Sequence, residues 1–65
     1  MLRIRQERKK RGWRLEDLAY HTRMSSADIS KIENGRLLPY PTHVERLSRA
    51  LGIPPDELLQ EVGKS

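Results

Sequence analysis

Glycine and proline divide this sequence into short segments, and within each segment apolar residues recur at helical spacing. The breaks fall at Gly12, at Asn34 and Gly35, at the prolines on either side of Tyr40, and at Gly52. No segment alternates apolar and polar residues over the length of a strand, and valine, isoleucine and aromatic residues are sparse. The pattern therefore predicts an all-α domain whose short helices are joined by tight turns.

Three helices are expected in the amino-terminal half of the chain. The first covers about residues 2–11 and stops before Gly12, because glycine readily ends a helix. The third covers about residues 25–33, with Ser25 as its N-cap and Asp28 reaching back in a capping box. The apolar residues expected to face the core from the second and third helices are Leu15, Leu18, Ala19, Ile29 and Ile32.

Two further helices are expected in the carboxy-terminal half. The fourth ends at Gly52, and its start is ambiguous, because Pro41 suits a first helical position whereas Thr42 with Glu45 makes a capping box. The fifth begins near Pro55 and has two acidic residues in its first turn. The core residues expected from these two helices are Val44, Leu47, Ala50, Leu51, Leu58 and Leu59, with Val62 as a further candidate.

A single domain is expected over residues 1–65, with a core of about residues 2–62. So short a chain buries only about 60% of the surface that its unfolded form exposes. It has no cysteine, so neither disulfides nor a zinc–thiolate site can hold it together, and packed helices must form the core. No apolar run approaches the ~20 residues of a membrane span, and no signal-peptide core follows the charged amino terminus. We therefore expect a cytoplasmic protein.

The positive charge of the chain is concentrated in its first half. Thirteen Lys and Arg against nine Asp and Glu give a net charge of +4. Residues 1–31 contain nine basic and four acidic residues, whereas residues 32–65 contain four and five. This asymmetry predicts one basic face, suited to nucleic acid or an acidic membrane, with a merely solvated surface as the plain alternative. The membrane is the weaker partner, because the basic segments share no helix with a broad apolar face.

The stretch from Leu15 to Gly35 has the organisation of a helix-turn-helix. Two helices of about eight residues are separated by three residues that end at Met24, whose side chain would fill the angle between them. Ala19 is small enough to let the third helix cross the second closely. The third helix would then expose small residues at its amino end and Lys31 one turn later, which fits the major groove of double-stranded DNA.

Taken in order, four features of the chain resemble the phage repressor and Cro-like family of helix-turn-helix DNA-binding domains. They are Arg8 four residues before Gly12, the motif LEDLA, the motif ISKIENG, and the closing stretch RLSRALGIPPDELL. The resemblance covers about residues 4–59. It implies a compact, five-helix, lambda-repressor-like domain whose third helix enters the major groove.

The resemblance also implies roles for individual residues. Ser26, Ala27 and Lys31 would meet base edges, the flanking serines would touch phosphate or a thymine methyl, and the loop after the helix would approach the DNA backbone. Arg8 and Glu33 match a pair that forms an internal salt bridge, so their role would be structural, with Arg8 also near phosphate. The residues expected to contact DNA are Arg14, Ser25, Ser26, Ala27, Ser30, Lys31, Asn34 and Arg36.

Two positions depart from the family pattern. Where the family has a Ser or Thr cap and then a glutamine that grips phosphate, this chain has Arg14 and Leu15. Leu15 cannot hydrogen-bond a phosphate, so that contact is expected from backbone amides at the helix start or from Arg14. This departure keeps open a second function, a protein-interaction module such as an antitoxin or bridging factor. Arg23 replaces a glycine of the turn, at a cost of about 1 kcal/mol if the residue is left-handed.

Other chemistry finds little support. His21 and His43 lack cysteines or a convergent set of carboxylates, so no metal site is expected. No nucleophile–base–acid arrangement and no glycine-rich phosphate loop is present, so neither an enzyme nor a cofactor is expected. Trp13 is expected in the core, whereas Tyr20 suits the core and a DNA-facing position equally. The basic residues expected to be mainly solvated, with some phosphate contact, are Arg5, Lys9, Lys10 and Arg11.

Apolar residues of the proline-marked loop point to self-association. Leu37, Leu38 and Tyr40 cannot all cover the core of so small a domain, and an exposed remainder suggests an interface with a second copy. Leu59 and Val62 are the other candidates for this interface. We therefore expect a weak homodimer that binds a palindromic operator, with half-sites about 34–36 Å apart, as a repressor rather than an activator.

Overall fold

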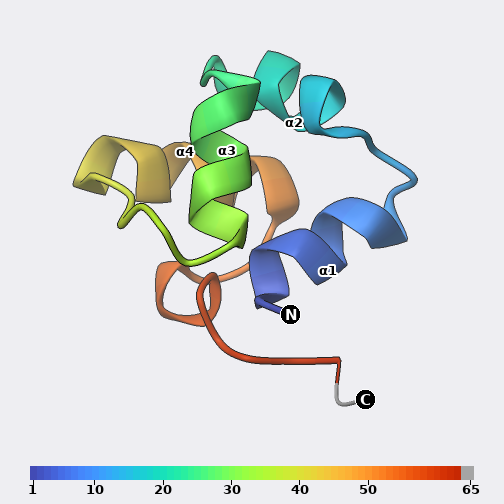
Figure 1. The fold of residues 1–65 in the computed structure, drawn as a ribbon, viewed down its shortest axis with the longest axis vertical. Coiled ribbons are helices and arrows are strands. Elements are labelled where there is room, and N and C mark those ends of the chain that lie inside the picture. The colour runs from blue at the N-terminus through green and yellow to red at the C-terminus, as the bar shows by residue number, and fades with distance from the viewer. Residues whose placement is uncertain (64–65) are drawn as a thin grey trace.

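The computed structural model describes residues 1–63 of the chain. It contains four α-helices, α1 (Arg3–Lys10), α2 (Leu15–Thr22), α3 (Ser26–Glu33) and α4 (Pro41–Leu51), followed by the short 3₁₀ helix η1 (Pro55–Glu57). In Figure 1, α3 lies in front of α4, α2 lies across the top, and α1 lies below α2. The all-α prediction is confirmed for the described residues. The expected domain of residues 1–65 includes residues 64 and 65, which lie outside them.

The prediction of five helices was wrong, because the fifth is only the three-residue turn η1. The backbone carbonyls that would extend it are used by the amino terminus of the chain. Leu58 O accepts the Ile4 N–H at 2.9 Å, and Gln60 O accepts the Arg3 N–H at 2.8 Å. Beyond these bonds the chain forms an isolated antiparallel bridge between Leu2 and Glu61. These long-range bonds hold the two ends of the domain together in place of a helix.

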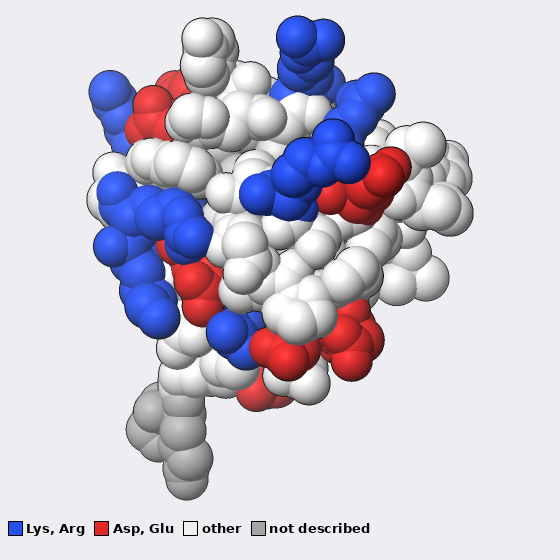
Figure 2. All heavy atoms as spheres, turned by 180° about the vertical axis from the view of Figure 1, so that it is seen from behind, with Lys and Arg blue, Asp and Glu red and all other residues white. Residues whose placement is uncertain are grey.

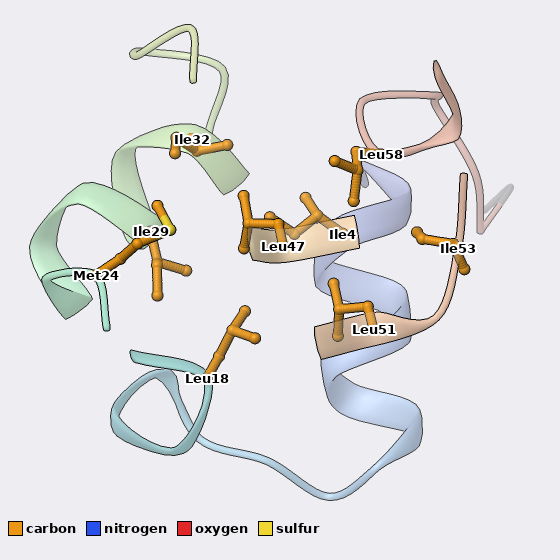
Figure 3. Packing of buried hydrophobic residues seen from close by; sticks show 9 residues of the cluster. All are labelled: Ile4, Leu18, Met24, Ile29, Ile32, Leu47, Leu51, Ile53 and Leu58. Atoms are coloured by element: carbon orange, nitrogen blue, oxygen red, sulfur yellow. The ribbon is translucent and has the colours of Figure 1, made fainter. Parts of the chain in front are cut away.

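The core is built from residues of all four helices, and the expected apolar stripes supply most of it. Figure 3 shows nine buried side chains converging between the elements. They are Ile4, Leu18, Met24, Ile29, Ile32, Leu47, Leu51, Ile53 and Leu58. Leu59, by contrast, is 38% exposed, because the carboxy-terminal segment that carries it is not helical. Full burial of a large apolar side chain stabilises a fold by about 1.5–3 kcal/mol, so this cluster is the main source of apolar stabilisation among the described residues.

Local signals fix the ends of several helices. Ser25 Oγ accepts the Asp28 N–H at 3.0 Å, as the N-cap prediction requires. The second bond of the capping box, from the Ser25 N–H to the Asp28 carboxylate, is not formed. The start of α4 is Pro41, and no side chain caps it, so the alternative start at Thr42 is not used. Arg23 ends α2 in the left-handed conformation, with φ of 59°. The strain expected at this turn is therefore present.

A buried carboxylate, Glu7, joins α1 to the carboxy-terminal part of the fold. Its oxygens accept hydrogen bonds from Arg3 and Arg11, each at 3.1 Å. Arg3 also pairs with Glu57 of η1, and Arg11 donates to the backbone carbonyl of Leu51 at 2.6 Å. Burial, the largest single effect, would raise the pKa of Glu7, but the hydrogen bonds from Arg3 and Arg11 and the charges of Lys10 and Arg3 together outweigh it, so the pKa is lowered. Glu7 is therefore held as a carboxylate.

Candidate nucleic-acid interface

The third helix is anchored on one side and open on the other. Ile29 and Ile32 are fully buried beneath it, and Met24 is buried in the turn that leads to it. Of the eight residues predicted to contact DNA, Ser26 and Ser30 are half-buried, and the other six are exposed. Seven of the eight lie on α3, on its N-cap or in the loop that follows it; Arg14, the eighth, precedes α2. The structure thus places most of them on one element, and their contacts with DNA stay a prediction.

Ser25 has two hydrogen-bonding roles available at the amino end of α3. Its Oγ is used as the acceptor that caps the helix. The hydroxyl hydrogen remains free to donate, for example to a phosphate oxygen. The backbone N–H groups of the first helical turn point in the same direction and favour an anion. This end of α3 therefore offers a hydroxyl and backbone N–H groups to a phosphate, while the carboxylate of Asp28 in the same turn opposes an anion.

A buried ion pair fixes the carboxyl end of α3 against α1. Arg8 Nε donates to Glu33 Oε2 at 2.7 Å, and Arg8 Nη2 donates to Glu33 Oε1 at 3.0 Å. Arg8 Nη1 donates to the carbonyl oxygen of Trp13 at 2.8 Å. The predicted salt bridge is confirmed. Because the guanidinium of Arg8 is buried and its three nitrogens are all engaged inside the protein, Arg8 does not offer a phosphate contact.

The amino end of α2 is poorly suited to binding a phosphate. Leu15 is half-buried against the core, so it offers only its backbone amide. The Asp17 carboxylate accepts the Arg14 N–H at 2.8 Å, and Glu16 adds a second negative charge to the first turn. These carboxylates oppose an incoming phosphate. The sequence predicts a phosphate donor here, either the backbone amides or Arg14. The exposed side chain of Arg14 is therefore the better of these two donors.

Two aromatic residues and the apolar loop divide between core and surface. Trp13 is half-buried, and its ring stacks on that of His21 with 4.3 Å between centroids, a contact that the sequence analysis missed. Tyr20 is 81% exposed, so it does not belong to the core. Leu37 packs against the core, whereas Leu38 and Tyr40 are 80% and 66% exposed. The loop thus leaves an apolar remainder at the surface, as expected.

The positive charge is not confined to the α3 side of the molecule. Figure 2 shows Lys and Arg side chains on the face opposite to that of Figure 1, in separate groups beside acidic residues. Part of the charge counted in the first half is neutralised within the fold, because Arg3, Arg8 and Arg11 pair with internal carboxylates. Within residues 1–63, no cluster of His, Cys, Asp and Glu could hold a metal ion, and no helix could span a bilayer.

Comparison with known proteins agrees with this geometry. A family model described as a helix-turn-helix domain matches residues 2–61. The HTH-type transcriptional repressor RghR of Bacillus subtilis is 38% identical over 61 residues, which cover 92% of this chain and 45% of RghR. RghRB of the same organism, an uncharacterized HTH-type transcriptional regulator, is also 38% identical over 61 residues, covering 92% of this chain and 44% of that protein.

An uncharacterized HTH-type transcriptional regulator of Mycobacterium tuberculosis is 38% identical over 52 residues. Those residues cover 80% of this chain and 20% of the mycobacterial protein. The chain thus spans between a fifth and a half of the length of these relatives. No solved structure matches it. The family model and the shared identity establish that the chain belongs to the helix-turn-helix domain family.

Proposed function

We propose that this chain binds double-stranded DNA as the DNA-binding domain of a transcriptional regulator, with α3 in the major groove. One observation carries the proposal: α3 is held from beneath by Ile29 and Ile32 while its other side presents small residues and Lys31. A helix of this kind enters the major groove without steric obstruction and reaches base edges. Membership of the helix-turn-helix family supports the proposal, and the relative named a repressor favours repression over activation.

The order of the helices and the Arg8–Glu33 pair also favour a phage repressor and Cro-like domain. On that basis Ser26, Ala27 and Lys31 read base edges. The residues that position the protein on the DNA backbone are Arg14, Ser25, Ser30, Asn34 and Arg36. This division separates contacts that carry sequence information from contacts that set register and affinity.

A binding-site selection with randomised duplexes tests the proposal. The account predicts a palindromic consensus whose half-sites are about 34–36 Å apart, one helical turn. Fluorescence anisotropy with the selected duplex then gives the salt dependence, with a slope of about −0.9 for each neutralised phosphate. Failure to enrich any duplex, together with no salt-dependent binding, would contradict DNA binding. Capture of one stable protein partner by the same preparation would then favour the interaction module.

The palindrome requires a dimer, and the exposed loop residues Leu38 and Tyr40 supply its most apolar surface. Leu59, 38% exposed, belongs to the same carboxy-terminal half. A patch of this size buries less than the ~1,200 Å² of a standard interface, so the free protein is a weak dimer that tightens on DNA. The positively charged surface around α3 is unsuited to this contact, because it would place like charges together.

A further inference from the structure

A cleft between α2 and α4 collects positive charge. It lies between the carboxyl end of α2 and the second half of α4 and has a volume of about 290 Å³. Its lining residues, none of them acidic, are His21, Thr22, Arg23, Arg46, Arg49 and Ala50. In Figure 1, α4 lies behind α3, and Figure 2, viewed from behind, shows Lys and Arg side chains on that face in separate groups beside acidic residues. The cleft shares no lining residue with the eight positions assigned to DNA, although Arg23 lies two residues before Ser25 in the chain.

Small residues give the cleft its depth, and arginines give it its hydrogen-bonding capacity. Ala50 is half-buried in its wall, and Thr22 is buried at its base. The hydroxyl of Thr22 already donates to the carbonyl oxygen of Leu18 at 2.7 Å. An incoming ligand would thus be bound by the guanidinium groups and not by the base of the cleft.

The arginines of the cleft lack the internal partners that other arginines of the chain have. Arg49 alone of the three is paired, with Glu45 at 3.3 Å, and the two side chains are 81% and 68% exposed. A pair this exposed is weak and exchanges readily for another anion. Neither Arg23 nor Arg46 forms an ion pair with a described residue. Two of the three arginines therefore have no ion-pair partner among the described residues, and the third has only an exposed one.

The conformation of Arg23 is the second observation. Its φ of 59° is left-handed, and every other described residue with positive φ is a glycine. Glycine at this position would relieve the strain and remove one of three neighbouring like charges. A basic residue at the carboxyl end of α2 is favoured by the negative end of the helix dipole, which explains one of these charges. Arg46 lies in the middle of α4, so the dipole does not explain it. The left-handed conformation itself ends α2, so what needs explaining is an arginine where glycine would suit the backbone better, and an anionic ligand explains it.

We propose that this cleft binds the phosphate group of a small phosphorylated ligand. Planar guanidinium groups form paired hydrogen bonds with phosphate oxygens, and three arginines line this cleft. The volume is close to the lower end of the range for small-molecule pockets, which suits a compact compound better than a peptide. None of the residues that line the cleft belongs to α3.

The test uses the DNA-free protein with inorganic phosphate and pyrophosphate as probes. Each is titrated into ¹⁵N-labelled protein at constant ionic strength, with sodium chloride as the reference salt. We expect saturable amide shifts at residues 21–23 and 46–50. Arg46→Gln and Arg49→Gln each weaken this binding by about fivefold or more, a change of about 1 kcal/mol. The control Lys9→Gln removes an exposed charge from α1 and leaves binding at the cleft unchanged.

Arg23→Gly gives an independent readout. It is expected to raise the midpoint of thermal unfolding while it weakens phosphate binding, a combination that a structural role for Arg23 does not produce. A lower midpoint with unchanged phosphate binding would contradict the proposal, as would shifts that grow linearly and match those from chloride. Saturation by duplex DNA or polyglutamate but not by either phosphate would also overturn it. None of these measurements requires the protein to bind DNA through α3.

Discussion

Arg8 and Glu33 form a buried, two-point ion pair that joins α1 to the end of α3. The bonds, at 2.7 and 3.0 Å, leave both Glu33 oxygens engaged, and the third nitrogen of Arg8 is bonded to the Trp13 carbonyl. The pair therefore fixes the carboxyl end of the proposed recognition helix, although both residues are buried. Removing one partner leaves the other charge buried without compensation.

We expect Glu33→Ala to lower the free energy of unfolding by about 3–5 kcal/mol, because Arg8 is left charged and buried. Glu45→Ala is the matched control: it also removes a helical glutamate paired with an arginine, but at the surface, and changes stability by at most about 1 kcal/mol. Urea unfolding of both variants measures the difference. Replacing both partners, as Arg8→Met with Glu33→Leu, should restore much of the loss. Equal effects of the two alanine variants would contradict the assigned role of the pair.

Glu7 predicts how stability depends on pH. Burial would raise its folded pKa, but hydrogen bonds from Arg3 and Arg11 together with the charges of Lys10 and Arg3 lower the pKa below the ordinary 4.5. A carboxyl group with a lowered pKa stabilises the fold above its unfolded pKa, and this contribution is lost as pH falls through the folded value. We therefore expect the wild type to lose more stability than Glu7→Gln as the pH decreases below about 4.5. Thermal unfolding from pH 6 to pH 3 measures both curves, and parallel curves would contradict the prediction.

Lys31 and Arg36 are assigned different roles: Lys31 reads a base, whereas Arg36 positions the protein on the DNA backbone. Lys31→Ala is expected to weaken binding to the selected duplex by about 1–3 kcal/mol, and unevenly across variants of the site. Arg36→Ala is expected to weaken binding to all sequences alike. It should also reduce the slope of log K against log salt concentration by about 0.9, the contribution of one phosphate. Anisotropy titrations against a panel of single-base variants compare the two. Indistinguishable specificity profiles would remove the division between the two roles.

Self-association is tested at the exposed apolar loop. Leu38→Glu with Leu59→Glu places charge on the proposed interface and should leave a monomer at concentrations where the wild type dimerises. Tyr20→Glu is the control, since Tyr20 is also large and 81% exposed but lies on α2, outside that surface. Sedimentation equilibrium with and without the palindromic duplex measures both variants. A wild type that stays monomeric on the duplex would exclude the dimer.

Sequence reasoning succeeded where local chemistry decides the structure. The N-cap at Ser25 and the buried Ile29 and Ile32 follow from residues within one or two turns, whereas the strain at the left-handed Arg23 was expected from the family resemblance. The fifth helix was wrong because the carbonyls after η1 bond to the amino terminus, some 55 residues away in the chain, as between Leu58 and Ile4.

A count of charged residues likewise misses contacts between distant parts of the chain. The excess of basic residues in the first half predicted one basic face, but a count does not reveal that Glu7 and Glu33 neutralise arginines inside the fold. Nor does it reveal that residues 23, 46 and 49 meet in one cleft, because that requires the packing of α2 on α4. The predicted DNA contacts depend on a partner, so only the exposure of these residues follows from the chain alone.

Methylation interference on the selected duplex tests the central claim, that α3 enters the major groove. Dimethyl sulfate methylates guanine N7 in the major groove and adenine N3 in the minor groove, so one reagent probes both grooves. The account predicts that methylation of guanines in each half-site blocks binding, and that Lys31→Ala abolishes the effect at the guanine it contacts. Interference confined to adenine N3, or none within the half-sites, would contradict placement of α3 in the major groove.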